Sequence, residues 1–432
     1  MISGAARQIL RGKRMAVSTE TATKRMTTRA WIVVALLVVS VVINYIDRSN
    51  LSLAVPLIKV QFRLSDIQVG ALGSAFYWTY ALLQLFGIVG WVTDRFQVGW
   101  VMVCGYLLWT GSTALTGFAT GFAALYATRL LLGVGESIAY PCYSRIFADM
   151  PEASRGRANA LIDAGTKIGP SIGLFLGGLI LARYRWPVLF IALGIGGLLW
   201  LGPWIGMMPK MGQKREPAQA TAQLSIVQLL SKRCAWGSFI GHFCGNYFYY
   251  FLMGWLPYYL VGEQKMSIGA AANFSAAIFF VTAAATIVTG WMTDRAVARG
   301  ATVTKARKHV AVCGLVIGSG LMTLGLVDKS LKLSIAVIAV SCTAYGVYSA
   351  NHWAMTQTLA GPRIAGRWSS VQNGVANLSG VATTWVAGAI KQSSGSSRMA
   401  FALTGAVALC GALAWGLLVD KVEEVQWDLE EV

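Results

Sequence analysis

Charged residues are scarce in this chain. Asp, Glu, Lys and Arg make up 12% of its 432 residues, whereas hydrophobic residues make up 56%. Soluble domains usually contain about 25% charged residues, so roughly half of the usual charge is missing. This deficit excludes a water-soluble globule. We therefore expect an integral membrane protein that crosses the bilayer several times.

Enzyme signatures and disulfide patterns are also missing. No Gly-rich loop ends in Gly-Lys-Ser/Thr, and neither His-Glu-x-x-His nor Cys-x-x-Cys occurs. The seven cysteines are odd in number and lie mostly in or beside apolar runs, so we interpret them as small hydrophobic residues. We expect no enzymatic activity, no cofactor and no metal site. Without an ATP site, uphill transport would have to use an ion gradient.

Long apolar runs recur along the whole chain. A bilayer core about 30 Å thick requires roughly 20 apolar residues per helical span. This rule predicts an all-α membrane protein with twelve transmembrane helices. The predicted spans are 31–57, 68–92, 99–119, 121–147, 157–182, 187–208, 236–261, 270–293, 309–327, 333–360, 368–390 and 399–420.

One hexapeptide is nearly repeated. Residues 90–95 read GWVTDR and residues 290–295 read GWMTDR, and each copy closes the second span of its own set of six. Such a repeat indicates a duplicated half. The predicted parts are an N-terminal tail (1–30), a six-helix bundle (31–208), a linker (209–235), a second six-helix bundle (236–420) and a C-terminal tail (421–432).

The net charge of +18 has an uneven distribution that indicates orientation. If the N-terminus is cytoplasmic, 24 of the 36 lysines and arginines lie in cytoplasmic segments, nine in outer loops and three within spans. This is a strong positive-inside bias. It accounts for the basic charge without a nucleic-acid partner, and it predicts that both termini are cytoplasmic. No small-residue cleavage site follows the first apolar run, so the basic N-terminus is interpreted as a tail.

Ionisable residues inside predicted spans are the most informative feature. Each costs about 2.5–3.5 kcal/mol on insertion scales, so each requires a reason. We find none in spans seven to twelve. The first half has three carboxylates and three cations within its spans, namely Asp47, Arg48, Arg129, Glu136, Asp163 and Lys167.

Helical spacing groups polar residues on shared faces. Residues three, four or seven apart lie on one side of a helix. In the first half this applies to Tyr45 with Arg48, Tyr80 with Gln84, and Arg129 with Glu136. In the second half, uncharged polar stripes comprise His242, Asn246 and Tyr250; Tyr345, Tyr348 and His352; and Asn373 and Asn377. A cleft between the halves would therefore have one ionic wall and one hydrogen-bonding wall, which suits a small polyhydroxy or aromatic acid.

Structural explanations compete with this functional interpretation. The ionic residues of spans one and four could form a buried ion-pair network that holds the half together. Asp163 and Lys167 are four residues apart and could neutralise each other. We interpret His242 and His352 as neutral packing residues.

The motifs resemble those of a known family. GWVTDR and GWMTDR are similar to the loop motif of the major facilitator superfamily, although FQVGW follows the first copy where Gly-Arg-Lys is usual. The resemblance implies that Asp94, Arg95, Asp294 and Arg295 are gating residues. Within the superfamily, NYIDRSNLSLAVP, TRLLLGVGESIAYP, NYFYYFLMGWLPYYL and VQNGVANLSGVA resemble the anion:cation symporter family, which includes hexuronate, galactonate and glucarate carriers.

This resemblance implies roles for the ionic residues. Asp47 and Glu136 match protonation sites, and Arg48 and Arg129 match arginines that bind or organise the anion. Tyr45, Tyr80 and Asn373 or Asn377 fall where relatives line the sugar-acid pocket. Lys167 departs from galactonate-type members, which have a neutral amide there. An extra cation indicates either a more anionic substrate or pairing with Glu136 or Asp163.

The sequence therefore predicts a proton-coupled symporter of an organic anion, a sugar acid such as a hexuronate, aldonate or aldarate, that works by alternating access. The expected substrate-binding residues are Tyr45, Arg48, Tyr80, Gln84, Arg129, Lys167, Asn246, Tyr250, Asn373 and Asn377. We expect a monomer in a bacterial inner membrane. Two alternatives stay open: an aromatic carboxylate as substrate, and an exchanger or uniporter on the same fold. A membrane sensor without flux and a membrane enzyme are weaker alternatives.

Overall fold

The structure is a computed structural model, and it describes residues 26–148, 150, 152–208, 226–324 and 331–426. Most of the predicted tails and linker lies outside the described residues. Within the described ranges, all regular secondary structure is helical.

The first half contains six helical rods, some of them built from two helices. They are α2 (Thr28–Phe62), α3 (Asp66–Leu85) with α4 (Ile88–Arg95), α5 (Val98–Thr116), α6 (Phe122–Ser137) with α7 (Ala139–Ala148), α8 (Glu152–Leu181), and α9 (Trp186–Leu198) with α10 (Leu201–Met207).

The second half also contains six rods, after the short helix α11 (Ile226–Leu230). They are formed by α12 (Arg233–Gly262), α13 (Ile268–Ala298), η1 (Thr304–His309) with α14 (Val310–Leu324), α15 (Leu331–Ser349), α16 (His352–Ser394), and α17 (Arg398–Leu413) with η2 (Ala414–Leu418). Gly361, at φ 65° and ψ 173°, interrupts α16. The residues before this break complete the tenth rod, and those after it form the eleventh.

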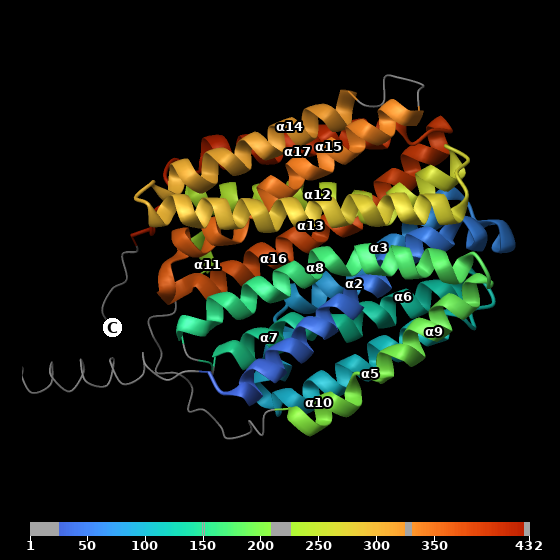
Figure 1. Cartoon of the computed structure of the whole chain (residues 1–432), viewed down its shortest axis with the longest axis horizontal. Coiled ribbons are helices and arrows are strands. Elements are labelled where there is room, and N and C mark those ends of the chain that lie inside the picture. Colours follow the sequence, from blue (N-terminus) through green and yellow to red (C-terminus); the bar gives the residue numbers. More distant parts are fainter. Residues whose placement is uncertain (1–25, 149, 151, 209–225, 325–330, 427–432) are drawn as a thin grey trace, which may run out of the picture.

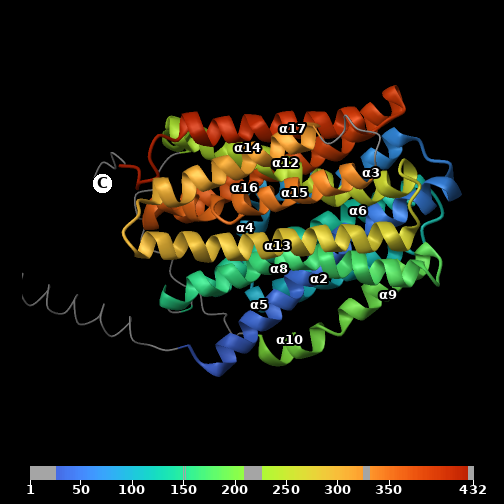
Figure 2. The same ribbon diagram turned by 45° about the horizontal axis from the view of Figure 1, so that its top comes forward.

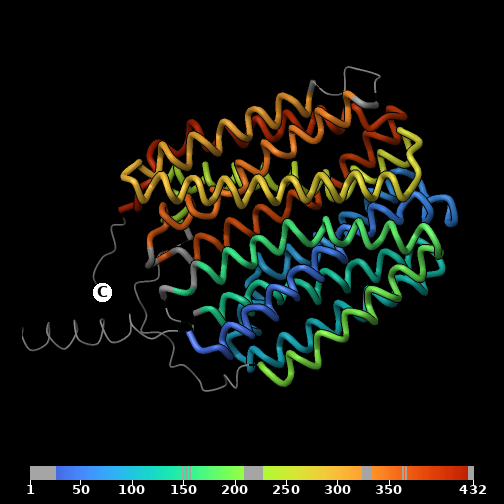
Figure 3. Tube along the Cα trace, in the orientation of Figure 1, coloured from blue at the N-terminus to red at the C-terminus, as the bar shows by residue number. Residues whose placement is uncertain are grey.

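The two halves lie side by side. Figures 1 and 2 show the blue-to-green helices on one side and the yellow-to-red helices on the other, and Figure 3 follows the chain through both. The predicted all-α architecture of two six-helix bundles is confirmed. The limits assigned to the bundles and linker stay a prediction.

Not every rod is equally apolar. By length and composition, eight described helices could cross a membrane, or nine if the bent pair α3 and α4 is one span. Helix α12 is long enough but carries five tyrosines together with His242 and Asn246, which lower its mean hydropathy. Polar side chains in a span are tolerated where they face the interior of the bundle. Here most of them are buried.

Three of the described helices, α2, α3 and α13, begin with a side-chain cap. Thr27 accepts a hydrogen bond from the Ala30 N–H, and Ser267 accepts one from the Ala270 N–H. Ser65 and Gln68 form a reciprocal capping box at the start of α3. Each cap satisfies a backbone donor that the helix itself leaves free. These caps stabilise the starts of these three spans, whereas α5, α6, α9 and α12 begin without a side-chain cap.

The two hexapeptides have different surroundings. The first lies on α4, which bends by 62° from α3 after Gly87, whose φ is 68°. The second lies inside α13, which continues to Ala298, beyond the predicted end of this span at residue 293. Nothing in Ala-Val-Ala stops a helix, and the chain turns only at Gly300, whose φ is 96°. The hexapeptide repeat is therefore not matched by identical local structure.

The halves meet firmly at one end of the molecule. We call it the distal end, because residues 63–65, 263–267 and 395–397 lie there, away from the described ends of the chain. The helix pairs that join the halves are α3 with α16, α8 with α13, and α2 with α12. The counterpart of α2 in the second half is α12, that of α3 is α13, and that of α8 is the part of α16 after Gly361. When each span is exchanged with its counterpart, the pair α3 with α16 becomes the pair α13 with α8, and the pair α2 with α12 is unchanged. This is the pattern expected of a pseudo-twofold axis.

Glycines permit close approach at the distal end. A Cβ atom on Gly70 would lie 2.6 Å from the Thr384 carbonyl oxygen, and one on Gly388 would lie 3.0 Å from the Gly70 Cα. Only glycine allows two helix backbones to approach so closely. By contrast, α4 and α7 at the opposite end pack mainly against their own half. The structure is therefore closed at its distal end.

A polar triad adds to this closure. The Lys59 ammonium lies 2.6 Å from Asp66 Oδ1 and donates to the Tyr258 hydroxyl at 2.9 Å. Tyr258 in turn donates to Asp66 Oδ1 at 2.5 Å. We call these three residues the distal latch. It joins α2 and α3 of the first half to α12 of the second.

Candidate functional site

Arg48 forms the centre of the polar interior. Its Nε lies 2.7 Å from Glu136 Oε2, and these side chains are 2% and 0% exposed. Its guanidinium lies 4.8 Å from the Tyr45 ring centroid, 4.6 Å from that of Phe76 and 4.8 Å from that of Tyr80. The ion pair and the aromatic faces together compensate for burying the charge. The contact between Arg48 and the Tyr45 ring agrees with their three-residue spacing, which places both side chains on one face of α2.

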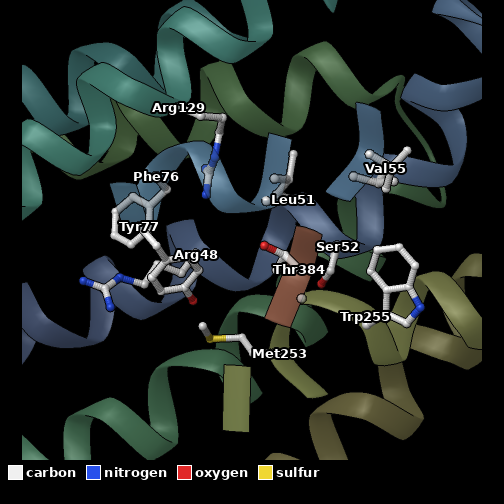
Figure 4. Close-up of a pocket in the computed structure, with 13 residues that line it drawn as sticks. Arg48, Leu51, Ser52, Val55, Phe76, Tyr77, Arg129, Met253, Trp255 and Thr384 are labelled. Carbon is white, nitrogen blue, oxygen red and sulfur yellow. The ribbon is translucent and has the colours of Figure 1, made fainter. Parts of the chain in front are cut away.

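Arg129 lies close to Arg48 but without a carboxylate in ion-pair distance among the described residues. Its guanidinium lies 5.6 Å from the Phe76 centroid, and its Nε has no hydrogen-bond partner. Both arginines line a narrow cavity of about 30 Å³, which can hold about two water molecules. Figure 4 shows side chains of both halves around it. From the second half, the cavity is lined by Met253, Gly254, Trp255 and Thr384.

The cavity is too small for an organic acid in this state. A ligand pocket normally encloses several hundred Å³. The distal closure brings α3 and α16 together beside it, so the cavity can widen only if the halves move apart. The arginines nevertheless face the gap between the bundles and not lipid.

Asp47 is held by a tryptophan that the sequence did not identify. Trp109 Nε1 of α5 donates to Asp47 Oδ2 at 2.7 Å, and Asp47 is 2% exposed. The indole of Trp109 is fixed by Tyr106, whose ring centroid lies 4.4 Å away. A hydrogen bond to a carboxylate favours its charged form. Trp109 carries no ionic signal, so only the folded structure reveals this role.

Several buried polar atoms near the arginines have no hydrogen-bond partner. Buried polar groups in proteins are nearly always paired, so an unpaired group indicates a site that binds water, an ion or a ligand. The unpaired atoms around the arginines are Asn44 Nδ2 and Oδ1, Asp47 Oδ1, Arg48 Nη2, Thr113 Oγ1, Arg129 Nε and Glu136 Oε1. Glu136 itself does not line the cavity; it lies behind Arg48.

The predicted amide residues and Tyr250 lie between the halves but do not line this cavity. Tyr250 donates to Asn377 Oδ1 at 2.9 Å within the second half. Asn373 Nδ2 donates to Gln84 Oε1 at 3.0 Å and so bridges the halves. Asn246 is partly buried and makes no hydrogen bond within the described part of the chain. The structure therefore brings Gln84, Tyr250, Asn373 and Asn377 to the interface, and their polar groups already bond one another.

Lys167 lies at the same interface but apart from the arginines. Its Nζ is 3.8 Å from Asp163 Oδ1 and 5.0 Å from the Tyr249 ring centroid of α12. Tyr249 also donates to the Thr166 carbonyl at 2.9 Å. No ion pair joins Lys167 to Glu136, so of the two predicted pairings the structure has the one with Asp163.

The predicted gating residues differ between the halves. Asp94 and Arg95 are exposed and form no ion pair among the described residues. Asp294 lies 2.6 Å from Arg307, and Arg295 lies over the Trp291 ring at 5.1 Å. Arg307 belongs to η1, which follows α13, whereas the corresponding segment after Arg95, FQVGW, contains no lysine or arginine that could pair with Asp94.

No constellation for metal chemistry is found among the described residues: no three His, Cys, Asp or Glu side chains are grouped to hold an ion. The cysteines that we can describe are unpaired, and Cys142, Cys244 and Cys342 are buried.

The comparisons with known proteins agree with this architecture. A sequence model of the Major Facilitator Superfamily matches residues 37–384, so the chain belongs to that superfamily. It is therefore a multi-pass integral membrane transporter and not an enzyme. The solved structure of a bacterial homolog of the human lysosomal transporter Spinster, in an inward-facing and occupied conformation, has a TM-score of 0.75 at 17% identity. The similarity covers 92% of this chain and 98% of the chain in that structure, and it is evidence for the fold alone.

Sequence relatives extend over nearly the whole chain. The probable galactarate/D-glucarate transporter GudP of Bacillus subtilis is 26% identical, with 93% of this chain and 94% of the relative covered. The D-galactonate transporter of Escherichia coli is 27% identical, with 92% and 97% covered. The chloroplastic ascorbate transporter of Arabidopsis thaliana is 27% identical, with 90% and 74% covered. The predicted resemblance to sugar-acid carriers is confirmed.

Proposed function

We propose that the protein is a proton-coupled symporter of an organic anion, with a sugar acid as its substrate. The observation that carries the proposal is the position of Arg48 and Arg129, which are buried yet line a cavity between the halves. Burying two cations is costly unless they are paired or bind an anion. Of these two arginines, Arg48 alone has a carboxylate partner within ion-pair distance in the described part of the chain. A substrate carboxylate would supply the second.

Coupling follows from the two nearby carboxylates. Asp47 and Glu136 are both nearly inaccessible to solvent, and each has an oxygen without a hydrogen-bond partner. Protonation of Glu136 would release Arg48 from its ion pair and leave the cleft net positive. The anion would then bind best when protons are bound, and the loaded protein would reorient.

The substrate class is supported by the relatives and by polar residues of the second half near the interface. Three relatives are named for galactarate or glucarate, galactonate, and ascorbate. The amides and phenols at Asn373, Asn377 and Tyr250 offer donors and acceptors for hydroxyl groups. The aromatic rings around Arg48 would also suit an aromatic carboxylate, which is the second candidate.

Location and orientation complete the proposal. We place the protein as a monomer in a bacterial inner membrane with both termini in the cytoplasm, because lysine and arginine are concentrated in the segments on that side. The distal end would then face outward, and the structure would be the state closed to the outside. Labelling of single cysteines placed at Ser396 and at Glu423 with an impermeant reagent in intact cells tests this orientation.

Proteoliposomes test the coupling. An inward proton gradient should drive uptake of a labelled sugar acid, while a sodium gradient at equal pH should not. Glu136→Gln should abolish proton-driven uptake but retain counterflow exchange, because the neutral amide resembles the protonated carboxyl. Loss of both activities would assign Glu136 to binding or folding. Uptake that is independent of the pH gradient would favour an exchanger or uniporter.

A further inference from the structure

The distal latch lies directly over the cavity that Arg48 and Arg129 line. Helices α2 and α12 end at the distal end, and α3 begins there. Each latch residue lies one helical turn distal to a residue that lines the cavity: Lys59 follows Val55, Asp66 precedes Val69, and Tyr258 follows Trp255. The ring centroids of Trp255 and Tyr258 are 5.0 Å apart. The latch therefore separates this cavity from the solution at the distal end.

Lys59 lies on the same face of α2 as Arg48. The two residues are 11 positions apart, which is close to three turns of an α-helix, or about 16 Å along its axis. Ser52 and Val55 lie between them on this face, and both line the cavity. In Figure 4, Val55 and Trp255 lie on one side of the cavity and Arg48 lies on the other. One face of α2 therefore carries a cation near each end of the cavity.

The latch has the donors of a carboxylate-binding site. The Lys59 ammonium and the Tyr258 hydroxyl both donate to Asp66 Oδ1, at 2.6 and 2.5 Å. Lys59 also donates to the Tyr258 hydroxyl at 2.9 Å, which holds the two donors together. A ligand carboxylate can accept from the same two donors, because it offers the same acceptor oxygens as Asp66. Asp66 thus occupies a position that a ligand carboxylate could take.

The latch is accessible to solvent even though the distal end is closed. The side chains of Lys59 and Asp66 are 29% and 18% exposed, whereas those of Arg48 and Glu136 are 2% and 0% exposed. Water screens a partly exposed ion pair, so the pair contributes little and its partners can exchange. Separating the buried pair would leave an uncompensated charge in a dry interior. A dissolved carboxylate can therefore compete with Asp66 for Lys59.

Exchange at Lys59 would also release the contact between the halves. Asp66 is fixed to α3 of the first half, and it accepts from Tyr258 of the second half. A ligand carboxylate is not attached to either half. Once it replaces Asp66, the polar contact no longer holds α3 to α12, and the ligand can itself move further into the cleft.

We propose that Lys59 and Tyr258 form an outer binding site for the substrate carboxylate, and that Asp66 occupies this site while the distal end is closed. This inference rests on the proposed function, which places the distal end outside, and it adds a first binding step. The anion would displace Asp66 from Lys59 and then pass along one face of α2 to Arg48 and Arg129. Asp66 would bind Lys59 again behind it and close the distal end.

The competing explanation is a latch that holds the halves together and binds no substrate. In that case, loss of either charged partner opens the distal end, and the KM for outside substrate changes in the same direction in both variants. With an outer binding site, the two variants differ in sign, because Lys59 binds the substrate and Asp66 competes with it. The direction of the change in KM therefore distinguishes the two explanations.

Uptake of radiolabelled D-galactonate by cells that express the full-length protein tests the proposal, because it gives the KM at the outer face. Lys59→Gln should raise KM about tenfold, since a charge-assisted contact is lost. Lys59→Arg keeps the charge and should hold KM within about threefold of the parent value. Asp66→Asn should lower KM about threefold, because the competing carboxylate is removed. It should also lower the maximal rate, because the distal end no longer closes fully.

A second ion pair at the distal end provides the matched control. Lys391 lies 2.5 Å from Glu263, the two side chains are 14% and 19% exposed, and neither residue lines the cavity. Lys391→Gln removes one positive charge from the distal end, as Lys59→Gln does, and should leave KM within about twofold.

Thiol labelling shows whether the variants open the latch. A cysteine introduced at Ser52, which lines the cavity, should react faster with an impermeant reagent in both Lys59→Gln and Asp66→Asn. The two variants would then share one effect on the distal end and have opposite effects on KM. Uptake with a measurable KM shows that each variant is folded.

The outcomes are distinct. A KM that is unchanged in Lys59→Gln, or that does not fall in Asp66→Asn, overturns the outer binding site while leaving organic-anion transport intact. An equal rise of KM in Lys391→Gln would assign the effect to general attraction of anions and overturn the site likewise. If Lys59→Gln shows no uptake, the KM of Asp66→Asn decides alone. If the parent protein takes up neither D-galactonate nor phthalate, the proposed function fails, and this inference fails with it.

Discussion

The buried ion pair between Arg48 and Glu136 gives the sharpest quantitative prediction. Its atoms lie 2.7 Å apart and its side chains are 2% and 0% exposed. Removing one partner strands the other charge in a dry interior, which typically costs about 3–5 kcal/mol. We expect Arg48→Gln and Glu136→Gln each to lower the free energy of unfolding by about this amount.

The double variant distinguishes an ion pair from two independent contacts. Arg48→Gln with Glu136→Gln leaves no unpaired charge, so its cost should fall short of the sum of the single costs by about 2 kcal/mol or more. Equilibrium unfolding in mixed detergent micelles provides the three differences. The matched cycle uses Asp294 and Arg307, which are 2.6 Å apart but 67% and 17% exposed. That surface pair should couple by only about 0–1 kcal/mol.

Additive single costs at Arg48 and Glu136 would refute the reasoning. They would mean that water reaches the pair and screens it, despite its low exposure. The same experiment tests the structural alternative: if the double variant is stable but does not transport, the pair acts in transport and not merely in holding the first half together.

Three further predictions concern other parts of the cleft. Trp109→Phe removes the hydrogen-bond donor to Asp47, so protonation of this carboxylate becomes more favourable. The pH dependence of uptake should therefore move to higher pH without loss of maximal rate. An unchanged pH profile would contradict the contact. Gly70→Leu should prevent distal closure and reduce uptake at least about tenfold. Gly269→Leu should leave uptake unchanged, because a Cβ atom at Gly269 meets open space. If both variants changed uptake equally, close backbone packing would not be the cause. Tyr258→Phe breaks the distal latch and should increase thiol labelling of a cysteine introduced at the distal end, and protection equal to that of the parent protein would show that the latch contributes little.

Much of the fold could be predicted from composition and hydrophobic length. Twelve apolar runs, a near-repeated hexapeptide and a polar break were sufficient, because a lipid environment leaves few alternatives to helices for a chain of this kind. The boundaries agreed within a few residues for most spans; the first rod, for instance, was predicted at 31–57 and is Thr28–Phe62. The breaks at Gly87 and Gly361 were not predicted. Any glycine can adopt a positive φ, and tertiary packing decides which glycines do so.

The sequence predicted which residues form the site better than it predicted which of these residues contact each other. Ionic residues in apolar runs stand out in a sequence, so Arg48, Arg129 and Glu136 were found directly. Which carboxylate pairs with which cation was left open. Helical spacing cannot settle it, because the partners lie on different helices. Trp109 carries no such signal, since a tryptophan in an apolar helix is usually a packing residue.

The sequence by itself determined that this chain is a helical membrane protein with two related halves and an asymmetric distribution of buried charge. Those properties depend on the cost of moving polar groups into hydrocarbon, which is summed residue by residue along the chain. Only the tertiary structure decided that Arg48 pairs with Glu136, that Asp47 is held by Trp109, and that the distal end is closed. These contacts join residues far apart in sequence, and their energies depend on distances that are set when the helices pack together.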